Sequence, residues 1–178
     1  MSTPTAGAPL PARRSAFWSV VFRAFYRLIR ALAPFVRSAI AHGAPGVDGI
    51  VEIRYVGPRS GRARRTLLTL LTVDDGWYIG HPNGSSAWVR GIEGAGVVEV
   101  DPPGALGSRF AVRTLAPGPE RDAVIRATWS QQPFPANFIY RAARRHVAAV
   151  GVYHRLDPIR ADPTAVDSTS VAPPLGAE

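Results

Sequence analysis

A chain of 178 residues with 46% apolar residues is long enough for one domain with a sizeable core. Its 17 Gly and 17 Pro argue against a purely helical bundle, and the absence of Cys excludes disulfides, Cys-ligated zinc and thiol catalysis. All 21 basic residues are Arg, which excludes a P-loop lysine, and the net charge of +8 predicts an anionic partner.

The N-terminal region divides into a tail and a helix. Residues 1–14 are small and Pro-rich, so we expect a disordered tail. Residues 15–41 carry the strongest amphipathic pattern of the chain, and the helix that this pattern predicts should be kinked or broken before Pro34. Its polar stripe contains four arginines and no acid: Arg23, Arg27, Arg30 and Arg37.

Two interpretations of this helix stay open. It lies on the core of its own domain, or residues 15–40 lie in the plane of an anionic membrane with the arginines on the headgroups. The arginines divide the apolar stretch into runs too short to span a bilayer, and no secretory signal pattern precedes them. We therefore expect a cytoplasmic protein that is either free or peripheral on the inner face of the membrane.

Hydrophobic alternation with period two dominates after the Gly-rich connector at 42–49. The predicted strands are 51–57, 66–73, 77–81, 96–101, 109–116 and 150–159, and the predicted helices are 118–132 and 138–148, the latter either a short helix or a helix running into a strand. We expect an α+β, mainly β fold over residues 42–160, with about six antiparallel strands in a small barrel and flanking helices. Residues 161–178 are polar and Pro-rich and predict a second disordered tail.

A basic turn joins the first two predicted strands. Residues 59–65 contain four arginines, flanked by Gly57 and Gly61. Crowded guanidinium groups repel one another unless an anion lies between them, and the rigid fork of Arg suits phosphate or carboxylate. The turn therefore indicates an anion-binding site, the alternative being a solvated basic loop.

A loop of small residues follows the third predicted strand, over residues 80–88. It offers backbone amides, two hydroxyls and the aromatic side chain of Trp88. Such a loop suits a planar ring system and its phosphate-bearing chain, although surface turns use the same residue types.

The basic turn and this loop, in this order between strands, resemble the deazaflavin (coenzyme F420)-dependent nitroreductase family of actinobacteria. The resemblance covers residues 50–158 and implies a split β-barrel that binds F420, with FMN as the alternative cofactor. By this resemblance, the phosphate and oligoglutamate tail of F420 would be held by Arg59, Ser60, Gly61 and Arg64, and the deazaflavin ring would be lined by Asn83, Gly84, Ser85 and Trp88.

Hydride transfer from a deazaflavin needs no protein nucleophile, so the lack of a convincing triad is expected. The resemblance places Tyr140 in the substrate pocket, and the loop places His81 near the ring, where either side chain could donate a proton or a hydrogen bond to the acceptor. The four histidines show no metal-ligand spacing, so we expect no metal site.

The sequence thus predicts an oxidoreductase that transfers a hydride from F420 to a quinone-like, nitro or other conjugated apolar acceptor. Three alternatives stay open: a split barrel that binds FMN or haem, a non-catalytic membrane-surface protein, and a basic nucleic-acid binder. The last is disfavoured because few aromatic residues lie among the arginines of the turn. Pairing into a homodimer is also left open.

Overall fold

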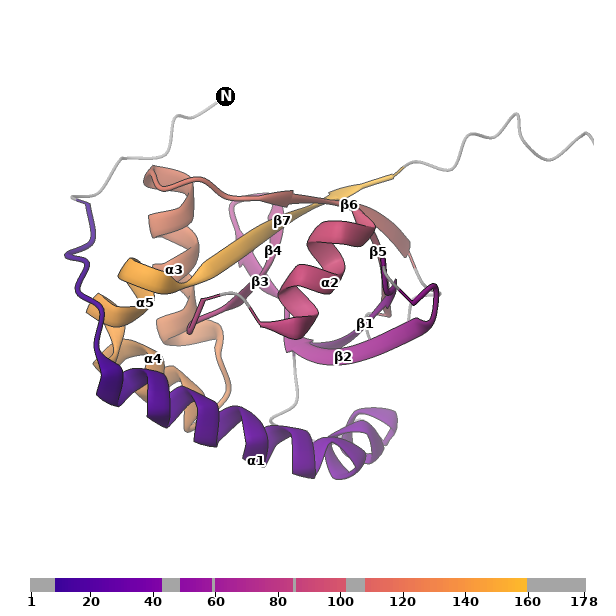
Figure 1. Ribbon diagram of the computed structural model, residues 1–178, viewed down its shortest axis with the longest axis horizontal. Helices are drawn as coiled ribbons and strands as arrows, with labels where there is room; N and C mark the ends of the chain where they lie inside the picture. The colour runs from indigo at the N-terminus through magenta and orange to yellow at the C-terminus, as the bar shows by residue number, and fades with distance from the viewer. Residues whose placement is uncertain (1–8, 43–48, 59, 85, 102–107, 160–178) are drawn as a thin grey trace, which may run out of the picture.

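The computed structural model describes residues 9–42, 49–58, 60–84, 86–101 and 108–159 (Figure 1). Within these ranges the chain forms seven strands and five helices. The strands are β1 (Ile50–Val56), β2 (Ala63–Thr69), β3 (Leu71–Val73), β4 (Gly76–His81), β5 (Val97–Asp101), β6 (Ser108–Thr114) and β7 (Val152–Pro158). The helices are α1 (Ala16–Ala41), α2 (Ala87–Ala95), α3 (Pro119–Gln131), α4 (Ala136–Ala142) and α5 (Arg144–Val150).

All the strands belong to one antiparallel sheet in the order β2-β1-β5-β6-β7-β4-β3. Its two edges, β2 and β3, are separated in the chain by Leu70 alone. A single residue spans at most roughly 3.6 Å, so the edges must approach each other and the sheet must curl. The predicted α+β fold, a curled antiparallel sheet with flanking helices and an N-terminal helix, is therefore confirmed, and the sheet forms a half-barrel.

The expected single strand over 66–73 is wrong, because it is divided at Leu70. The N–H of Leu70 donates to the carbonyl of Gly49 (2.7 Å) and so leaves the ladder. This division gives seven strands where about six were expected, and it places the two halves of one apolar run on opposite edges of the sheet.

Helix α2 covers the interior of the sheet at one end (Figure 1). The sequence analysis predicted no helix here, and Gly91 and Gly94 do disfavour one. Both glycines serve packing: a Cβ on Gly91 would lie 2.5 Å from the ring of Tyr55. The sheet core that α2 shares with the strands consists of Val51, Ile53, Tyr55, Leu68, Ile79, Ile92, Val98, Val100, Phe110 and Leu156.

A second core lies where α1, α3, α4 and α5 meet the other end of the sheet. Phe22 of α1 is fully buried there. Helix α1 runs on through Pro34 to Ala41, so a break before Pro34 is wrong. The buried residues of this helical core are Phe22, Leu71, Tyr78, Leu115, Val124, Ile125, Ala136, Tyr140, Ala143, Val147 and Tyr153. No helix in the described ranges is both long and apolar enough to cross a membrane.

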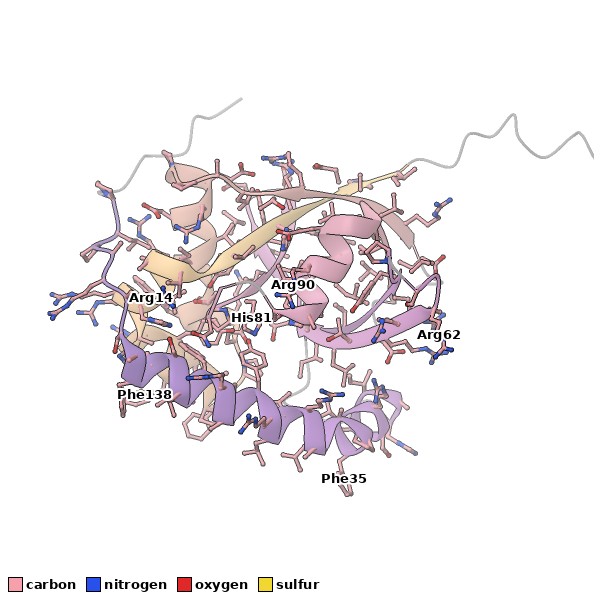
Figure 2. The ribbon with its side chains drawn as sticks, viewed as in Figure 1. Arg14, Phe35, Arg62, His81, Arg90 and Phe138 are labelled. Carbon is pink, nitrogen blue, oxygen red and sulfur yellow. The ribbon has the colours of Figure 1, made fainter. Side chains whose placement is uncertain are left out.

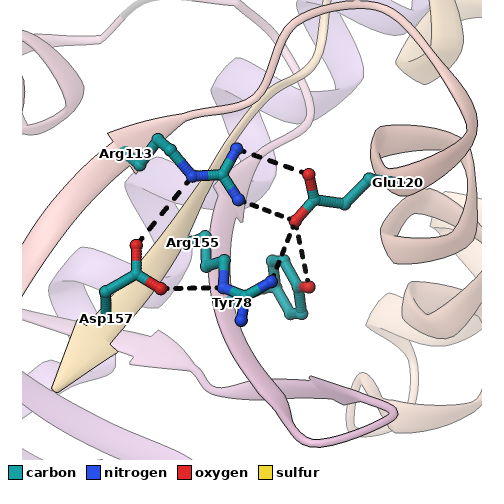
Figure 3. A network of polar contacts seen from close by, with 5 residues as sticks. All are labelled: Tyr78, Arg113, Glu120, Arg155 and Asp157. Atoms are coloured by element: carbon teal, nitrogen blue, oxygen red, sulfur yellow. Dashed lines mark hydrogen bonds and ion pairs between the residues drawn. The ribbon is translucent and has the colours of Figure 1, made fainter. Parts of the chain in front are cut away.

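A network of charged residues fastens α3 to the sheet (Figure 3). Glu120 accepts hydrogen bonds from Arg113 (2.9 Å), from the hydroxyl of Tyr78 (3.2 Å) and from Arg155 (3.4 Å), and Arg155 also pairs with Asp157 (2.8 Å). Burial raises the pKa of Glu120, but the hydrogen bonds and charges of its partners more than offset this effect and the pKa is lowered. The network is half-exposed, so each pair contributes at most about 1 kcal/mol.

Candidate functional site

The basic turn between β1 and β2 is closed by its own backbone. The N–H of Gly57 donates to the carbonyl of Arg62 (2.9 Å), and the N–H of Gly61 donates to the carbonyl of Gly57 (2.9 Å). Gly61 has a φ of 60°, which glycine adopts without strain. The hydroxyl of Ser60 accepts from the N–H of Arg62 (3.4 Å). The predicted residues Ser60 and Gly61 are both exposed on this turn.

The guanidinium groups of the turn and of the first residues of β2, where Arg64 and Arg65 lie, differ in their partners. Arg65 lies 3.7 Å from Glu52. Arg62 and the predicted Arg64 are exposed and pair with no carboxylate among the residues that the structure describes. Arg59 lies outside those residues. Arg62 and Arg64 thus present positive charge that no acid of the described chain neutralises, an arrangement that favours an anionic ligand.

His81 lies at the end of β4, buried between two aromatic rings. Its ring stacks on Tyr26 of α1 (4.6 Å between centroids) and meets Trp88 edge-on (5.8 Å). Burial lowers the pKa of His81 to about 4, against a smaller opposing effect of a backbone hydrogen bond at Gly84. The ring is therefore neutral at neutral pH. Its Nδ1 accepts from the N–H of Asn83 (3.2 Å), so Nε2 carries the proton.

The side-chain amide of Asn83 is hydrogen-bonded within the protein. Its Oδ1 accepts from Nε2 of His146 (3.0 Å), and its Nδ2 donates to the carbonyl of Ser19 (3.2 Å). Nδ1 of His146 accepts from the N–H of Ser15 (3.1 Å). Burial and the charge of Arg14 lower the pKa of His146, which keeps this ring neutral too. The predicted ring-binding residue Asn83 therefore fixes α1 and α5 to the loop that carries it.

The rest of the Gly-rich loop leads into α2. Gly84 has a φ of 75°, and Ser85 lies outside the described residues. Ser86 caps α2, its side chain accepting from the N–H of Val89 (3.4 Å). Trp88 is half-buried in the first turn of α2 and packs against the sheet core.

Helix α2 connects the two predicted binding features. Trp88 near its start contacts His81, and Gly94 near its end approaches the basic turn so closely that a Cβ there would lie 2.7 Å from Cγ of Pro58. A nine-residue helix is roughly 13 Å long. Figure 2 shows α2 between His81 and Arg62. The turn and the aromatic loop therefore lie at the two ends of one short helix.

Tyr140 lies deeper than the sequence suggested. It is buried in the helical core, and its hydroxyl is 2.7 Å from the hydroxyl of Tyr26. Burial, reinforced by the neighbouring Tyr26, raises the pKa of Tyr140 well above its ordinary value. Tyr26, whose pKa burial raises to about 12, thus lies between Tyr140 and His81.

Tyr26 and His146 are the site residues that sequence reasoning missed. A signal existed for Tyr26, because Ser15, Ser19 and Tyr26 follow the edge of the polar stripe of α1. No local signal existed for His146, whose partner Asn83 is 63 positions away. In the part of the chain that the structure describes, no three His, Asp or Glu residues come together as a metal site.

No protein-family model and no curated protein matches the chain. Among solved structures, an F420-H2 dependent reductase (FDR-A) is 16% identical, with 61% of this chain and 94% of that chain covered and a TM-score of 0.49. The heme storage protein HutZ from Vibrio cholerae is 12% identical, with 73% and 92% covered and a TM-score of 0.48.

A third similar structure is a pyridoxamine 5'-phosphate oxidase-related, FMN binding protein from Nostoc punctiforme, 12% identical, with 73% and 80% covered and a TM-score of 0.42. The names of these three proteins mention three different ligands: F420, haem and FMN. At such low identities and TM-scores the likeness does not indicate which ligand this chain binds. Any assignment has to be argued from the residues of this chain.

Proposed function

We propose that this chain binds coenzyme F420 and uses it to reduce a conjugated, apolar acceptor such as a quinone or a nitro compound. The observation that carries the proposal is the pair Arg62 and Arg64, without acidic partners in the described chain, in a glycine turn that α2 joins to the contact between His81 and Trp88. A long ligand with anionic groups at one end and a flat ring at the other matches this arrangement.

The residues of the turn would hold the anionic end of the ligand, and those of the loop would line its ring. Of the predicted set, Arg64, Ser60 and Gly61 are exposed and accessible to a phosphate. Asn83 would contribute through the shape of the loop, since its side chain is already bonded to His146 and Ser19. Trp88 offers an indole ring beside His81.

Bound F420 would supply a hydride, and the protein would supply orientation, a dry site and hydrogen bonds. His81, neutral above a pKa of about 4, would donate a hydrogen bond from Nε2 rather than act as an imidazolium acid. Tyr140 would act through Tyr26, because the two hydroxyls are bonded and Tyr26 stacks on His81. Tyr26 is thus the phenol nearest to the histidine in this proposal.

Titration of the purified protein with F420 and with FMN, followed by fluorescence, tests the proposal. We expect Arg64→Gln to weaken F420 binding by about tenfold, because a charged hydrogen-bonding partner is lost. Arg65→Gln is the matched control: it removes the same charge from the next position of β2, but this arginine already pairs with Glu52. Binding of neither cofactor, or equal losses in both variants, would refute the assignment of this turn.

Cofactor choice separates the proposal from its closest alternative. FMN carries a single phosphate and haem two carboxylates, so neither calls for as many arginines as this turn holds. Binding of FMN or haem in preference to F420 would therefore identify an FMN- or haem-binding barrel. If F420 binds, loss of its reduced form on addition of a quinone measures the reductase activity.

A second function, attachment to an anionic membrane surface, is favoured by one observation on α1. Its apolar residues exceed what the core covers: Phe17 is 67% exposed and Phe35 is 72% exposed, and Val20 and Leu28 lie on the same stripe. At about 100° per residue this stripe lies beside the arginine stripe and away from buried Phe22. Figure 2 shows Phe35 and Phe138, another exposed side chain, on the α1 side of the molecule.

Flotation with vesicles of phosphatidylglycerol and phosphatidylcholine tests the membrane function. The double substitution Phe17→Ser with Phe35→Ser should abolish flotation, because burial of a Phe side chain stabilises by about 2 kcal/mol. Val56→Ser with Ile159→Ser is the control, since both residues are exposed apolar side chains outside α1. Flotation that survives both double substitutions would remove α1 as the anchor.

A further inference from the structure

A second basic site lies far from the turn between β1 and β2. The segment before α1 and the residues from the end of α4 into α5 line a cavity of about 540 Å³ that is widely open to solvent. Its lining is Arg13, Arg14, Ser15, Trp18, Ala142, Ala143, Arg144, Arg145 and His146. Figure 2 shows Arg14 and Arg62 at opposite ends of the molecule, so the two basic sites are separate.

Four arginines line this cavity, and no acidic residue of the described chain is among its lining residues. Arg13, Arg14, Arg144 and Arg145 are all exposed, and none forms an ion pair within the described ranges. Four like charges around one cavity repel one another, and the repulsion persists because no carboxylate of the described residues lines the cavity. An anion bound in the cavity would offset it.

Two hydrogen bonds from the backbone before α1 hold the two walls of the cavity together. The N–H of Arg13 donates to the carbonyl of Arg145 (2.8 Å), and the N–H of Ser15 donates to Nδ1 of His146 (3.1 Å). The second bond joins positions 131 residues apart. The arginines therefore extend from backbone that is already fixed, which lowers the entropy that a ligand must overcome.

The electrostatic field of the cluster reaches the back wall of the cavity. His146 is buried there, and the charge of Arg14 adds to burial in lowering the pKa of this histidine. Trp18, half-buried, supplies an apolar wall beside the charges.

We propose that this cavity binds a phosphate group, either of a soluble phosphorylated compound or of a lipid headgroup, between Arg13 and Arg14 on one wall and Arg144 and Arg145 on the other. Guanidinium forks bind phosphate oxygens in pairs, and a doubly charged anion offsets more of the cluster than a carboxylate does. The site is independent of F420 binding, which uses the turn at the other end of the molecule.

Calorimetric titration of the full chain with inorganic pyrophosphate tests the site. We expect saturable binding by the unmodified protein and at least about tenfold weaker binding by the variant Arg14→Gln with Arg145→Gln. Arg109→Gln with Arg141→Gln is the control: it removes the same charge, and its arginines are exposed but do not line the cavity. The control should retain pyrophosphate affinity within about twofold.

Amide NMR shifts on adding pyrophosphate should be largest at Ser15 and at residues 144–146. Binding to vesicles with and without phosphatidylglycerol then identifies the source of the phosphate. If it belongs to a lipid headgroup, Arg14→Gln with Arg145→Gln should also weaken vesicle binding. If it belongs to a soluble compound, vesicle binding should not change. Absent pyrophosphate binding, or equal weakening in the control, would overturn the site. F420 titration of the same variants should be unchanged, which separates this failure from failure of the proposed function.

Discussion

The sheet core around Ile53 and the helical core around Phe22 are held together differently. The sheet core combines strands with an amphipathic helix, and its cluster is wholly apolar apart from the hydroxyl of Tyr55. The helical core joins residues from 22 to 153 along the chain, and buried or half-buried polar contacts surround it. Two of these contacts, Tyr26 with Tyr140 and His146 with Asn83, connect positions 114 and 63 residues apart.

This difference bears on where a function can be built. Apolar packing in the sheet core makes a rigid wall behind α2, whereas the polar contacts of the helical core converge on the loop that carries His81. Helix α1 supplies Tyr26 and the carbonyl of Ser19 to that convergence. The candidate site therefore depends on α1 staying docked.

Phe22→Ala should have the largest effect on stability. Phe22 is fully buried, meets Tyr140 edge-on (5.4 Å) and stacks on His146 (6.0 Å). Its loss leaves a cavity and should lower the free energy of unfolding by about 3–5 kcal/mol, measured by urea denaturation. Val20→Ala on the exposed stripe of the same helix should change it by no more than about 0.5 kcal/mol. Similar small effects from both substitutions would show that α1 is not part of the core.

Acidification should destabilise the protein by comparable amounts through His81 and through His154. Burial lowers the pKa of His81, beside the helical core, and of His154, on β7, from 6.5 to about 4. Each contribution is fully present above pH 6.5, where folded and unfolded rings are both neutral. It is lost as the pH falls from 6.5 through about 4, because over this range the unfolded chain binds a proton and the folded chain does not.

A shift of this size corresponds to about 3 kcal/mol for each histidine. His81→Gln and His154→Gln should each flatten the fall in unfolding free energy between pH 6.5 and pH 4 by that amount, as urea titrations at several pH values would measure. A slope left unchanged by both substitutions would place the acid sensitivity in the carboxylates instead.

Sequence reasoning reached the sheet core better than the helical core. Strands predicted over 51–57, 77–81 and 109–116 match β1, β4 and β6 because alternation records directly which side chains are buried. The division at Leu70 was missed because no turn residue marks it. Helix α2 was missed because glycines that are needed for close packing have the same local signature as a loop.

The site was predictable to the extent that it is local. Clustered charge made the turn around Arg64 visible in the sequence, and the structure exposes that turn. The internal bonds of Asn83 and the position of Tyr140 behind Tyr26 were not predictable, because they depend on segments that are distant in sequence meeting in the fold. Pairwise polar contacts of this kind leave no periodic pattern to detect.

Gly91→Ala sets helix propensity against packing in the sheet core. Propensity alone predicts a gain of about 1 kcal/mol, since alanine favours a helix. The structure predicts a loss of about 1–3 kcal/mol, because the added Cβ would lie 2.5 Å from the ring of Tyr55. In a Tyr55→Ala background the clash disappears, and the same substitution should stabilise the protein. Stabilisation in both backgrounds, by thermal denaturation, would contradict the packing of α2 on β1.

The hydroxyl pair of Tyr26 and Tyr140 gives the smallest effect and the most direct test of the docked helix. Each Tyr→Phe substitution should cost about 1 kcal/mol, because it leaves the other hydroxyl buried without its partner. The double substitution removes both hydroxyls together and should cost less than the sum of the single ones, a coupling that urea denaturation resolves through a double-mutant cycle. Tyr78→Phe with Tyr140→Phe is the control pair, since the hydroxyl of Tyr78 bonds to Glu120 instead and its cost should add. If the losses of unfolding free energy for Tyr26→Phe and Tyr140→Phe add, the two hydroxyls do not bond to each other. That result would contradict the position of Tyr26 between Tyr140 and His81.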